Sequence, residues 1–338
     1  FVAFQSSASN LVSADTGGWS DIFVHDRSTR RTERLSLTPD GIGANSDSEN
    51  PSISADGRYV AFTSKASNLV PGDTNGVMDI FVTPSLSLRH VSPDGRDLYG
   101  MFWNDCKNPQ YPCKTIQQAL DMSRGLDVVR VARGLYVENL ILEAQRASEI
   151  QGGWDRNFAR RSEQPGLTVI DGNDMDSVFD IQAESESLHL IVSSLTVQNG
   201  KSSWIGGGYY ILSDQADVIL KLDSCLLKNN EASGGGIGVQ SDHNGRLKLT
   251  LESCLVENNH TGGYGGGLEA YLPSGEAEIK IVNSLMTKNY ASHRGGAMRI
   301  YNSGSTMGLQ ILNTTITDNH GSPDGGGVYI HHADRNSE

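Results

Sequence analysis

Five short segments of the chain repeat one pattern: SSLTVQN (193–199), DSCLLKN (223–229), ESCLVEN (252–258), NSLMTKN (283–289) and NTTITDN (313–319). Their last residues recur at a nearly constant interval and form one column, Asn199, Asn229, Asn258, Asn289 and Asn319. A second motif, GGG or GGA, recurs in phase at 206–208, 234–236, 265–267, 295–297 and 325–327. Two motifs coupled at one period indicate a chain built from repeated structural units.

The residue types identify the repeat as β-structure, because β-branched residues and glycine are poor helix formers. After the glycines, aliphatic and mixed positions alternate, as in a strand with one face in a core. We therefore expect stacked rungs about 4.8 Å apart that form a parallel β-solenoid. Asn tolerates the left-handed backbone conformation, and its amide both donates and accepts hydrogen bonds. The asparagine column therefore predicts a hydrogen-bonded ladder at a turn.

The asparagine and GGG motifs resemble the repeats of polymorphic outer-membrane proteins and related bacterial surface proteins. Upstream, VSPDG (91–95), CKTIQQAL (113–120) and DVVRVARGLYVENL (127–140) resemble the start of a pectate-lyase-like (pectin lyase-like) right-handed parallel β-helix. That resemblance implies a short helix that caps the first turn of the coil. It also implies secretion or display at the cell surface.

A different repeat lies near the N-terminus, where FVAFQSSASNLVSADTGGWSDIFV (1–24) matches YVAFTSKASNLVPGDTNGVMDIFV (59–82) without a gap. Short strands with turns that repeat in this way are typical of propeller blades. PSISADGRYVAF (51–62) and DIFVHDRSTRRTERLS (21–36) resemble TolB-like β-propeller repeats. The predicted fold is all-β, with incomplete propeller blades over 1–83, a linker over 84–90 and the β-helix over 91–338.

The composition of the chain limits the classes of partner that it can bind. The chain has 338 residues, 27 Lys and Arg against 40 Asp and Glu, and a net charge of −13, which argues against nucleic acid as a partner. No apolar run reaches the roughly 20 residues that a membrane helix needs. Because the sequence begins with Phe1 and stops soon after a repeat, we expect it to be a piece of a longer chain.

Four cysteines are present. Cys106 and Cys113 flank a short loop before the expected helix, and a disulfide between them is predicted if the protein is exported. Cys225 and Cys254 occupy one column of adjacent rungs, which is compatible either with buried thiols or with a disulfide.

One motif has the oxygen ligands that calcium prefers. Asp73, Asn75 and Asp79 lie at i, i+2 and i+6 around a glycine. The other copy of the repeat lacks the middle ligand, so a hydrogen-bonded turn is the alternative to a calcium site. We expect no other cofactor.

Catalytic motifs are absent, since Ser-His-Asp and phosphate-loop signatures do not occur. Asp171, Asp174 and Asp176 cluster in VIDGNDMDS, which a polar turn explains as well as an active site does. Polysaccharide lysis or hydrolysis therefore depends on fold analogy alone.

The outward positions of the strand after the glycines predict a binding surface instead. Aromatic and charged side chains alternate there, which suits contact with glycans or proteins. The candidate residues are Tyr210, Glu269, Tyr271, Arg299, Tyr301, Tyr329 and His331. The predicted function is adhesion or glycan or protein recognition at a cell surface without catalysis. The alternatives are a polysaccharide lyase or glycoside hydrolase and a structural spacer.

Overall fold

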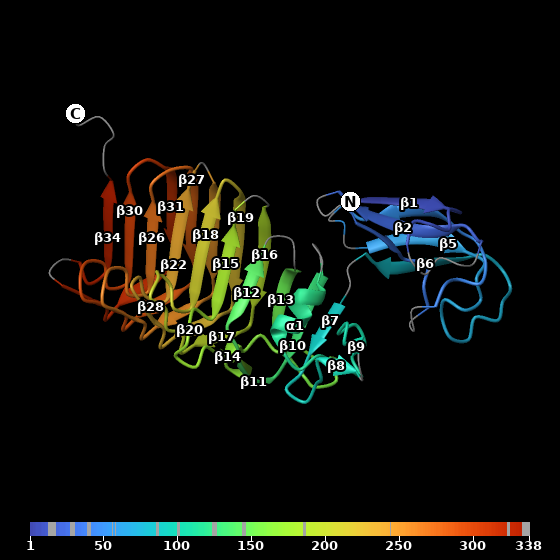
Figure 1. Cartoon of the computed structure of the whole chain (residues 1–338), viewed down its shortest axis with the longest axis horizontal. Coiled ribbons are helices and arrows are strands. Elements are labelled where there is room, and N and C mark those ends of the chain that lie inside the picture. The colour runs from blue at the N-terminus through green and yellow to red at the C-terminus, as the bar shows by residue number, and fades with distance from the viewer. Residues whose placement is uncertain are drawn as a thin grey trace. The chain divides into compact units, whose positions relative to one another are not determined.

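The computed structural model describes residues 1–12, 18–27, 31–38, 42–55, 57, 59–85, 88–99, 102–123, 127–143, 147–184, 187–243, 245–322 and 325–332. The chain divides into two compact units, Phe1–Ser87 and Leu88–Glu338, and each is described by itself. Strands dominate both units, and the described residues include one α-helix, α1 (Ile116–Met122), and one short 3-10 helix, η1 (Pro165–Leu167) (Figure 1). The predicted all-β class is therefore confirmed. Within the described ranges, neither helix has the length and apolar character needed to cross a membrane.

The first unit contains two three-stranded antiparallel sheets, ordered β1-β2-β3 and β4-β5-β6. Their strands are β1 (Val2–Ser6), β2 (Asp21–Asp26), β3 (Arg31–Arg34), β4 (Ser48–Ile53), β5 (Tyr59–Ser64) and β6 (Asp79–Pro84). Phe4 lies opposite Phe23 in the first sheet, as Phe62 lies opposite Phe81 in the second. Their ring centroids are 5.6 and 5.7 Å apart. The N-terminal sequence repeat is therefore a repeated pair of strands.

The second unit is a right-handed parallel β-solenoid, which confirms the fold predicted from the asparagine and glycine repeats. Two of its parallel sheets, which we call sheet 1 and sheet 3, face each other across the core. Sheet 1 has the order β31-β27-β23-β19-β16-β13-β10-β7. Its strands are β7 (Leu88–Val91), β10 (Asp127–Ala132), β13 (Ala147–Trp154), β16 (Leu188–Ser193), β19 (Asp217–Asp223), β23 (Arg246–Glu252), β27 (Glu276–Val282) and β31 (Thr306–Leu312).

Sheet 3 carries the strand that follows each glycine cluster. Its strands are β12 (Leu140–Glu143), β15 (Phe179–Ala183), β18 (Tyr209–Asp214), β22 (Ile237–Asp242), β26 (Leu268–Leu272), β30 (Met298–Asn302) and β34 (Val328–His332).

Two narrower sheets complete the rungs, where a rung is one turn of the solenoid, and sheet 4 is present only in the last four described rungs. Sheet 2 consists of β11 (Gly134–Val137), β14 (Thr168–Asp171), β17 (Thr196–Gln198), β20 (Leu226–Lys228), β24 (Leu255–Glu257), β28 (Leu285–Thr287) and β32 (Thr315–Thr317). Sheet 4 consists of β21 (Glu231–Ala232), β25 (His260–Thr261), β29 (Tyr290–Ala291) and β33 (His320–Gly321). A two-stranded antiparallel sheet, β8 (Leu98–Tyr99) and β9 (Phe102–Trp103), lies outside the rungs.

The solenoid core is a stack of aliphatic columns. On sheet 3 the inward positions predicted from the sequence are fully buried in consecutive rungs, as at Ile237, Leu268 and Met298. These residues are register partners, so each side chain packs on the equivalent side chain of the next rung. The aliphatic residues at alternate positions of each strand therefore stack into a continuous apolar interior.

The asparagine ladder is present but lies partly one residue later than the sequence analysis placed it. The ladder consists of the buried Asn230, Asn259 and Asn289 and the half-buried Asn319, and each side-chain amide donates to the side-chain oxygen of the next asparagine, at 3.0, 3.0 and 2.9 Å.

The remaining predicted ladder members occupy the preceding turn position, where the exposed Asn258 amide also donates to the Asn229 side-chain oxygen at 2.6 Å. Asn199, Asn229 and Asn258 have positive φ of 53 to 55°. Lys288 fills the equivalent place in the fourth rung, also with positive φ. The residue with positive φ, such as Asn258, places its side chain outside the turn. The residue that follows it, such as Asn259, points its side chain into the turn. The interval between Asn258 and Asn289 is longer than the others in the predicted column, and it is the sequence signal of this shift.

Helix α1 packs beside the first rungs, where it contacts β7, β10 and β12. Thr115 caps its N-terminus by accepting a hydrogen bond from the Gln118 amide at 3.2 Å. The Glu138 carboxylate accepts from the amides of Ile116 and Gln117 at 2.9 and 3.0 Å. Burial raises the pKa of Glu138 to about 6.

The solenoid begins slightly earlier than residue 91. Leu88–Val91 form β7, which pairs in parallel with β10, so the last residues of the expected linker belong to a solenoid strand.

Candidate functional site

Three aromatic rings form a stacked column on the outer side of sheet 3. Tyr271, Tyr301 and His331 are register partners in β26, β30 and β34. The ring centroids of Tyr271 and Tyr301 are 5.4 Å apart, and those of Tyr301 and His331 are 5.1 Å apart. The planes are tilted by only 14° and 16°. The structure therefore brings together three of the predicted site residues.

An ion pair lies next to this column. Arg299 pairs with Glu269 across adjacent rungs, and both side chains are largely buried. The Arg299 guanidinium lies 4.0 Å from the ring centroid of Tyr264 and 5.1 Å from that of Tyr301. Burial raises the pKa of Glu269 to about 7, although Arg299 opposes that rise. The ion pair thus fixes a cation between two aromatic rings.

A second arginine extends the cluster toward the last rung. Arg294 donates to the Tyr329 hydroxyl at 3.1 Å, and its guanidinium lies 5.0 Å from the ring centroid of Tyr329. Tyr264 contacts His293, with ring centroids 5.0 Å apart. We call Tyr264, Glu269, Tyr271, Arg294, Arg299, Tyr301, Tyr329 and His331 the aromatic cluster.

Tyr264 is the member of the cluster that sequence reasoning missed. It lies inside the run Gly262–Gly267, directly before the third GGG motif. A large ring flanked by glycines was the available signal, because glycines leave room beside such a ring.

Tyr210 is not part of this cluster. It shares the outward column with Glu269, but Gly238 lies between them in the intervening rung. The space over Gly238 is occupied by Ile205, whose backbone lies within 2.3 Å of where a Cβ atom would be. The candidate surface therefore covers three rungs rather than five.

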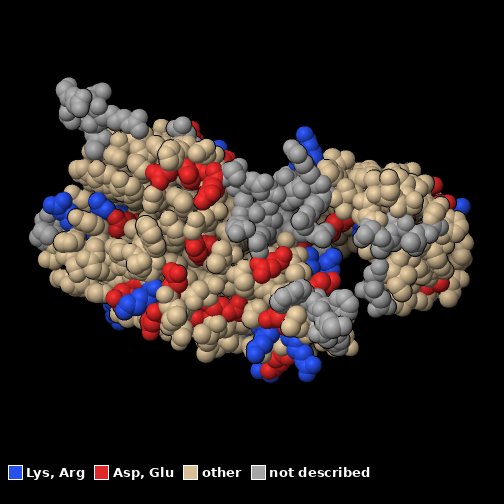
Figure 2. Space-filling model, viewed as in Figure 1, with Lys and Arg blue, Asp and Glu red and all other residues tan. Residues whose placement is uncertain are grey.

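A second stacked column, which was not predicted from the sequence, lies on sheet 4. His260, Tyr290 and His320 are register partners, with successive ring centroids 4.7 and 5.1 Å apart. In Figure 2, uncharged residues make up most of the visible face of the molecule, and neither sign of charge gathers into one broad patch.

The predicted calcium ligands lie in a hydrogen-bonded turn. The Asn75 amide donates to the two carboxylate oxygens of Asp79 at 3.3 and 3.0 Å, and its oxygen accepts from the Val77 amide at 3.0 Å. These bonds give Asn75 and Asp79 a role in the turn itself. Calcium binding by Asp73, Asn75 and Asp79 stays a prediction.

Two carboxylates of the VIDGNDMDS segment, those of Asp171 and Asp176, accept hydrogen bonds in the turns of the solenoid. Asp171 accepts hydrogen bonds from Gln198 and Asn199 of the next rung, both at 2.8 Å, and from the Asn173 amide at 2.9 Å. Among the residues that the structure describes, no three His, Cys, Asp or Glu side chains converge as metal ligands would.

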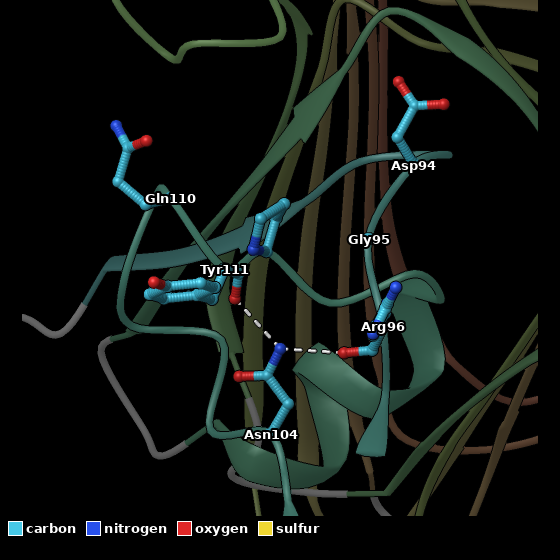
Figure 3. A pocket seen from close by; sticks show the side chains of 7 residues that line it. Asp94, Gly95, Arg96, Asn104, Gln110 and Tyr111 are labelled. Atoms are coloured by element: carbon cyan, nitrogen blue, oxygen red, sulfur yellow. Dashed lines mark hydrogen bonds between the residues drawn. The ribbon is translucent and has the colours of Figure 1, made fainter. Parts of the chain in front are cut away.

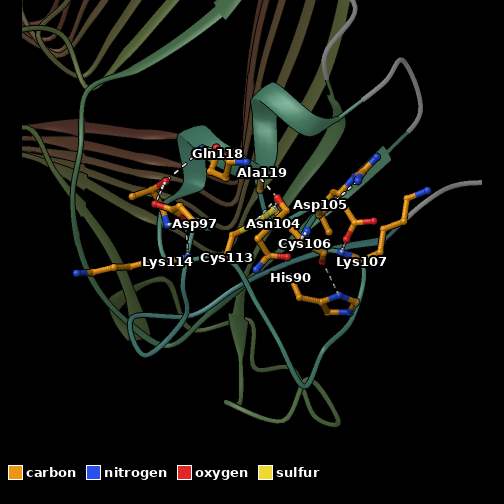
Figure 4. The surroundings of a disulfide bond; sticks show 12 residues. His90, Asp97, Asn104, Asp105, Cys106, Lys107, Cys113, Lys114, Gln118 and Ala119 are labelled. Atoms are coloured by element: carbon orange, nitrogen blue, oxygen red, sulfur yellow. Dashed lines mark hydrogen bonds between the residues drawn. A yellow bond between two sulfur atoms is a disulfide. The ribbon is translucent and has the colours of Figure 1, made fainter. Parts of the chain in front are cut away.

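Cys106 and Cys113 form the predicted disulfide, with their Cα atoms 5.1 Å apart (Figure 4). Asn104 organises this loop, since its side-chain oxygen accepts from the Cys106 amide at 3.0 Å and its backbone carbonyl accepts from Gln118 of α1 at 3.0 Å. The neighbouring His90 donates to the Cys106 carbonyl at 3.2 Å, and burial lowers its pKa to about 4.

A small polar cavity of about 280 Å³ lies beside this loop (Figure 3). The Asn104 amide donates to the backbone carbonyls of Arg96 and Tyr111 at 2.8 and 2.9 Å. Asp94 is the one carboxylate in the lining, and it already pairs with Arg156. The cavity can hold a small polar molecule by hydrogen bonds, but its lining offers no pair of carboxylates for acid–base chemistry.

Comparison with known proteins identifies no family, because no family model, curated protein or solved structure matches this chain.

Proposed function

We propose that the solenoid is a non-catalytic recognition module that binds glycan chains through the aromatic cluster. The observation that carries this proposal is the stacked column of Tyr271, Tyr301 and His331 beside Arg299. Tyr271 is 39% exposed and His331 is also exposed, so the column is accessible from solvent.

The stacking geometry determines which groups a ligand can contact. Each inner ring face is covered by the next ring, so ring edges, tyrosine hydroxyls and histidine nitrogens point outward. These groups donate and accept hydrogen bonds at the rung spacing. An extended polymer with a hydroxyl-rich repeat, lying along the solenoid axis, matches that arrangement better than an apolar protein patch does.

The buried ion pair supports the proposal by making the surface rigid. Arg299 is held by Glu269 and by two aromatic rings, so a ligand meets an ordered surface and loses less conformational entropy on binding.

The test is binding of the full chain to a panel of neutral and acidic polysaccharides, measured by calorimetry. Tyr301→Ala is expected to weaken binding about tenfold or more. Tyr290→Ala is the matched control, because this residue lies in the same rung between two histidine rings but on sheet 4.

Two outcomes would contradict the proposal. One is that no polysaccharide binds, which would favour a structural spacer or a protein partner, or that Tyr301→Ala binds polysaccharide as tightly as the unaltered chain does, which would mean that the binding site lies elsewhere. The other is the release of new reducing ends or unsaturated products during the incubation, which would identify a hydrolase or a lyase.

The same proposal extends to the families that the two units resemble and to the location of the protein. We take the two sheets of the first unit as parts of TolB-like propeller blades, because equivalent strand pairs recur in step with the N-terminal sequence repeat. We take the solenoid as pectate-lyase-like, with α1 as its cap and repeats like those of polymorphic outer-membrane proteins. An extracellular or cell-surface location follows from that resemblance, and the Cys106–Cys113 disulfide supports it.

A further inference from the structure

Two free thiols lie next to each other inside the solenoid. Cys225 precedes β20 and Cys254 precedes β24, and the amide of Leu255 donates to the Cys225 carbonyl at 2.9 Å. The two cysteines are therefore direct neighbours in adjacent rungs, about 4.8 Å apart. Cα separations of about 4.4 to 6.8 Å are those found in disulfides.

Their side chains point in the same direction. The Cys225 sulfur lies 3.4 Å from the Val192 carbonyl oxygen, and the Cys254 sulfur lies 3.4 Å from that of Leu222. Val192 and Leu222 are themselves register partners, so the two thiols occupy equivalent positions displaced by one rung. A hydrogen bond with Cys225, together with burial, raises the pKa of Cys254.

Another buried polar group belongs to the same core cluster as the two cysteines. The Tyr209 side chain is fully buried and stacks on Phe179, and its hydroxyl has no hydrogen-bond partner among the described residues. Burial raises the pKa of Tyr209, and the two cysteines add to the rise.

We propose that Cys225 and Cys254 are a site of covalent modification at which a disulfide closes between adjacent rungs when the chain folds in the presence of a small-molecule disulfide. The chain already contains one disulfide, Cys106–Cys113, so the conditions that form it also act on the second pair.

The reaction is two successive thiol–disulfide exchanges with oxidised glutathione as oxidant. One cysteine thiolate attacks a glutathione sulfur, which breaks the glutathione disulfide, forms a mixed disulfide and releases one glutathione. The second cysteine thiolate attacks the protein sulfur of that mixed disulfide and releases the second glutathione. The two thiol protons end on the two glutathione molecules, and two electrons pass from the protein to the oxidant.

The experiment refolds the full chain, reduced and unfolded, in a mixture of oxidised and reduced glutathione. Free thiols are then alkylated in denaturant, and the peptides are mapped by mass spectrometry. We expect no free thiol and a peptide that links Cys225 to Cys254. Circular dichroism of the same sample verifies that the solenoid has folded.

Two double variants test the geometry, because Ser284 occupies the next position in the same column. Cys225→Ser with Ser284→Cys keeps the two thiols in adjacent rungs and is expected to close. Cys254→Ser with Ser284→Cys places them two rungs apart, about 9.6 Å, which is beyond the reach of a disulfide. That variant is expected to keep both thiols free.

The proposal is overturned if the unaltered chain refolds with Cys106 joined to Cys113 while Cys225 and Cys254 are both alkylated. It is also overturned if the variant with thiols two rungs apart closes as fully as the unaltered chain, since stacking would then not direct the bond.

Discussion

The tetrapeptide DIFV occurs twice in the first unit, and its two copies have opposite surroundings. In β2, Ile22 and Val24 are 0% and 4% exposed, whereas their equivalents in β6, Ile80 and Val82, are 77% and 68% exposed. Both copies form a strand that pairs antiparallel with the preceding equivalent strand, but β2 also pairs with β3, whereas β6 is the last strand of its sheet. What differs is the neighbour: Ile22 and Val24 share a buried cluster with Val60 and Phe62 of the second sheet.

The solenoid shows the same effect on a regular repeat. Met298 and Ile300 in β30 are fully buried, but their equivalents Val328 and Ile330 in β34, the last strand that the structure describes, are 36% and 53% exposed. In both units, equivalent positions have the same backbone and different burial. Sequence pattern decides which face a side chain takes, and the next sheet or rung decides whether that face is covered.

The largest expected effect is the difference in stability between truncating Ile22 and truncating its equivalent, Ile80. Ile22→Ala should lower the free energy of unfolding of the first unit by about 4 kcal/mol, because it removes buried methyl groups and leaves a cavity. Ile80→Ala should change it by less than about 0.5 kcal/mol, since that side chain is already in water. Hydrogen exchange of the β2 and β5 amides in the full chain measures both values, and equal losses would break the comparison.

A second test uses the neighbouring asparagines of one turn. Asn259 makes hydrogen bonds to Leu227, Asn230 and Asn289 while fully buried, so Asn259→Ala should cost roughly 3 to 4 kcal/mol of unfolding free energy. Asn258 is exposed and has a left-handed backbone, which glycine also adopts, so Asn258→Gly should cost less than about 1 kcal/mol. Chemical denaturation of the solenoid compares the two, and a larger loss for Asn258→Gly would mean that the ladder lies in the other column.

The third test concerns Glu269, which is outward-facing by pattern but only 4% exposed. Its folded-state pKa of about 7 lies above the ordinary value of 4.5, so between these values the folded state binds more protons than the unfolded state. Stability from this group is therefore fully present below about pH 4.5 and is lost as the pH rises to about 7.

Glu269→Gln should remove this pH dependence. Between about pH 4.5 and 7, the difference in unfolding free energy between the variant and the unaltered chain should therefore change by about 3 kcal/mol. Urea denaturation at pH 4 to 8 measures it. Glu276→Gln, which removes an exposed carboxylate of β27, is the control for the loss of one surface charge. A parallel pH profile for the unaltered chain and Glu269→Gln would show that the carboxylate is not buried in solution.

Much of the solenoid could be predicted because its repeat period can be read directly from the sequence. The inward columns at Ile237, Leu268 and Met298 followed from alternation, and the stacked column of Tyr271, Tyr301 and His331 followed from the register of the repeat. The ladder was placed one residue early at Asn229 and Asn258 because two adjacent asparagines occupy that turn, and only the backbone conformation separates them.

Tyr264 and the burial of Glu269 could not be predicted in the same way. Tyr264 lies in a glycine-rich turn with no periodic partner, and its place over Arg299 depends on how that turn folds against sheet 3. Glu269 is buried by contacts with Gly234 in the preceding rung and Arg299 in the next.

Patterns within the chain were enough to establish the all-β class, the period of the solenoid, the inward columns and the Cys106–Cys113 pair, because each depends on local alternation or on short separations along the chain. The packing of rungs and sheets was needed to tell which copy of DIFV is covered, which asparagines form the ladder and which thiols and aromatic rings meet. Those features depend on contacts between rungs and sheets that are distant along the chain, and an equivalent residue meets a different neighbour in each copy.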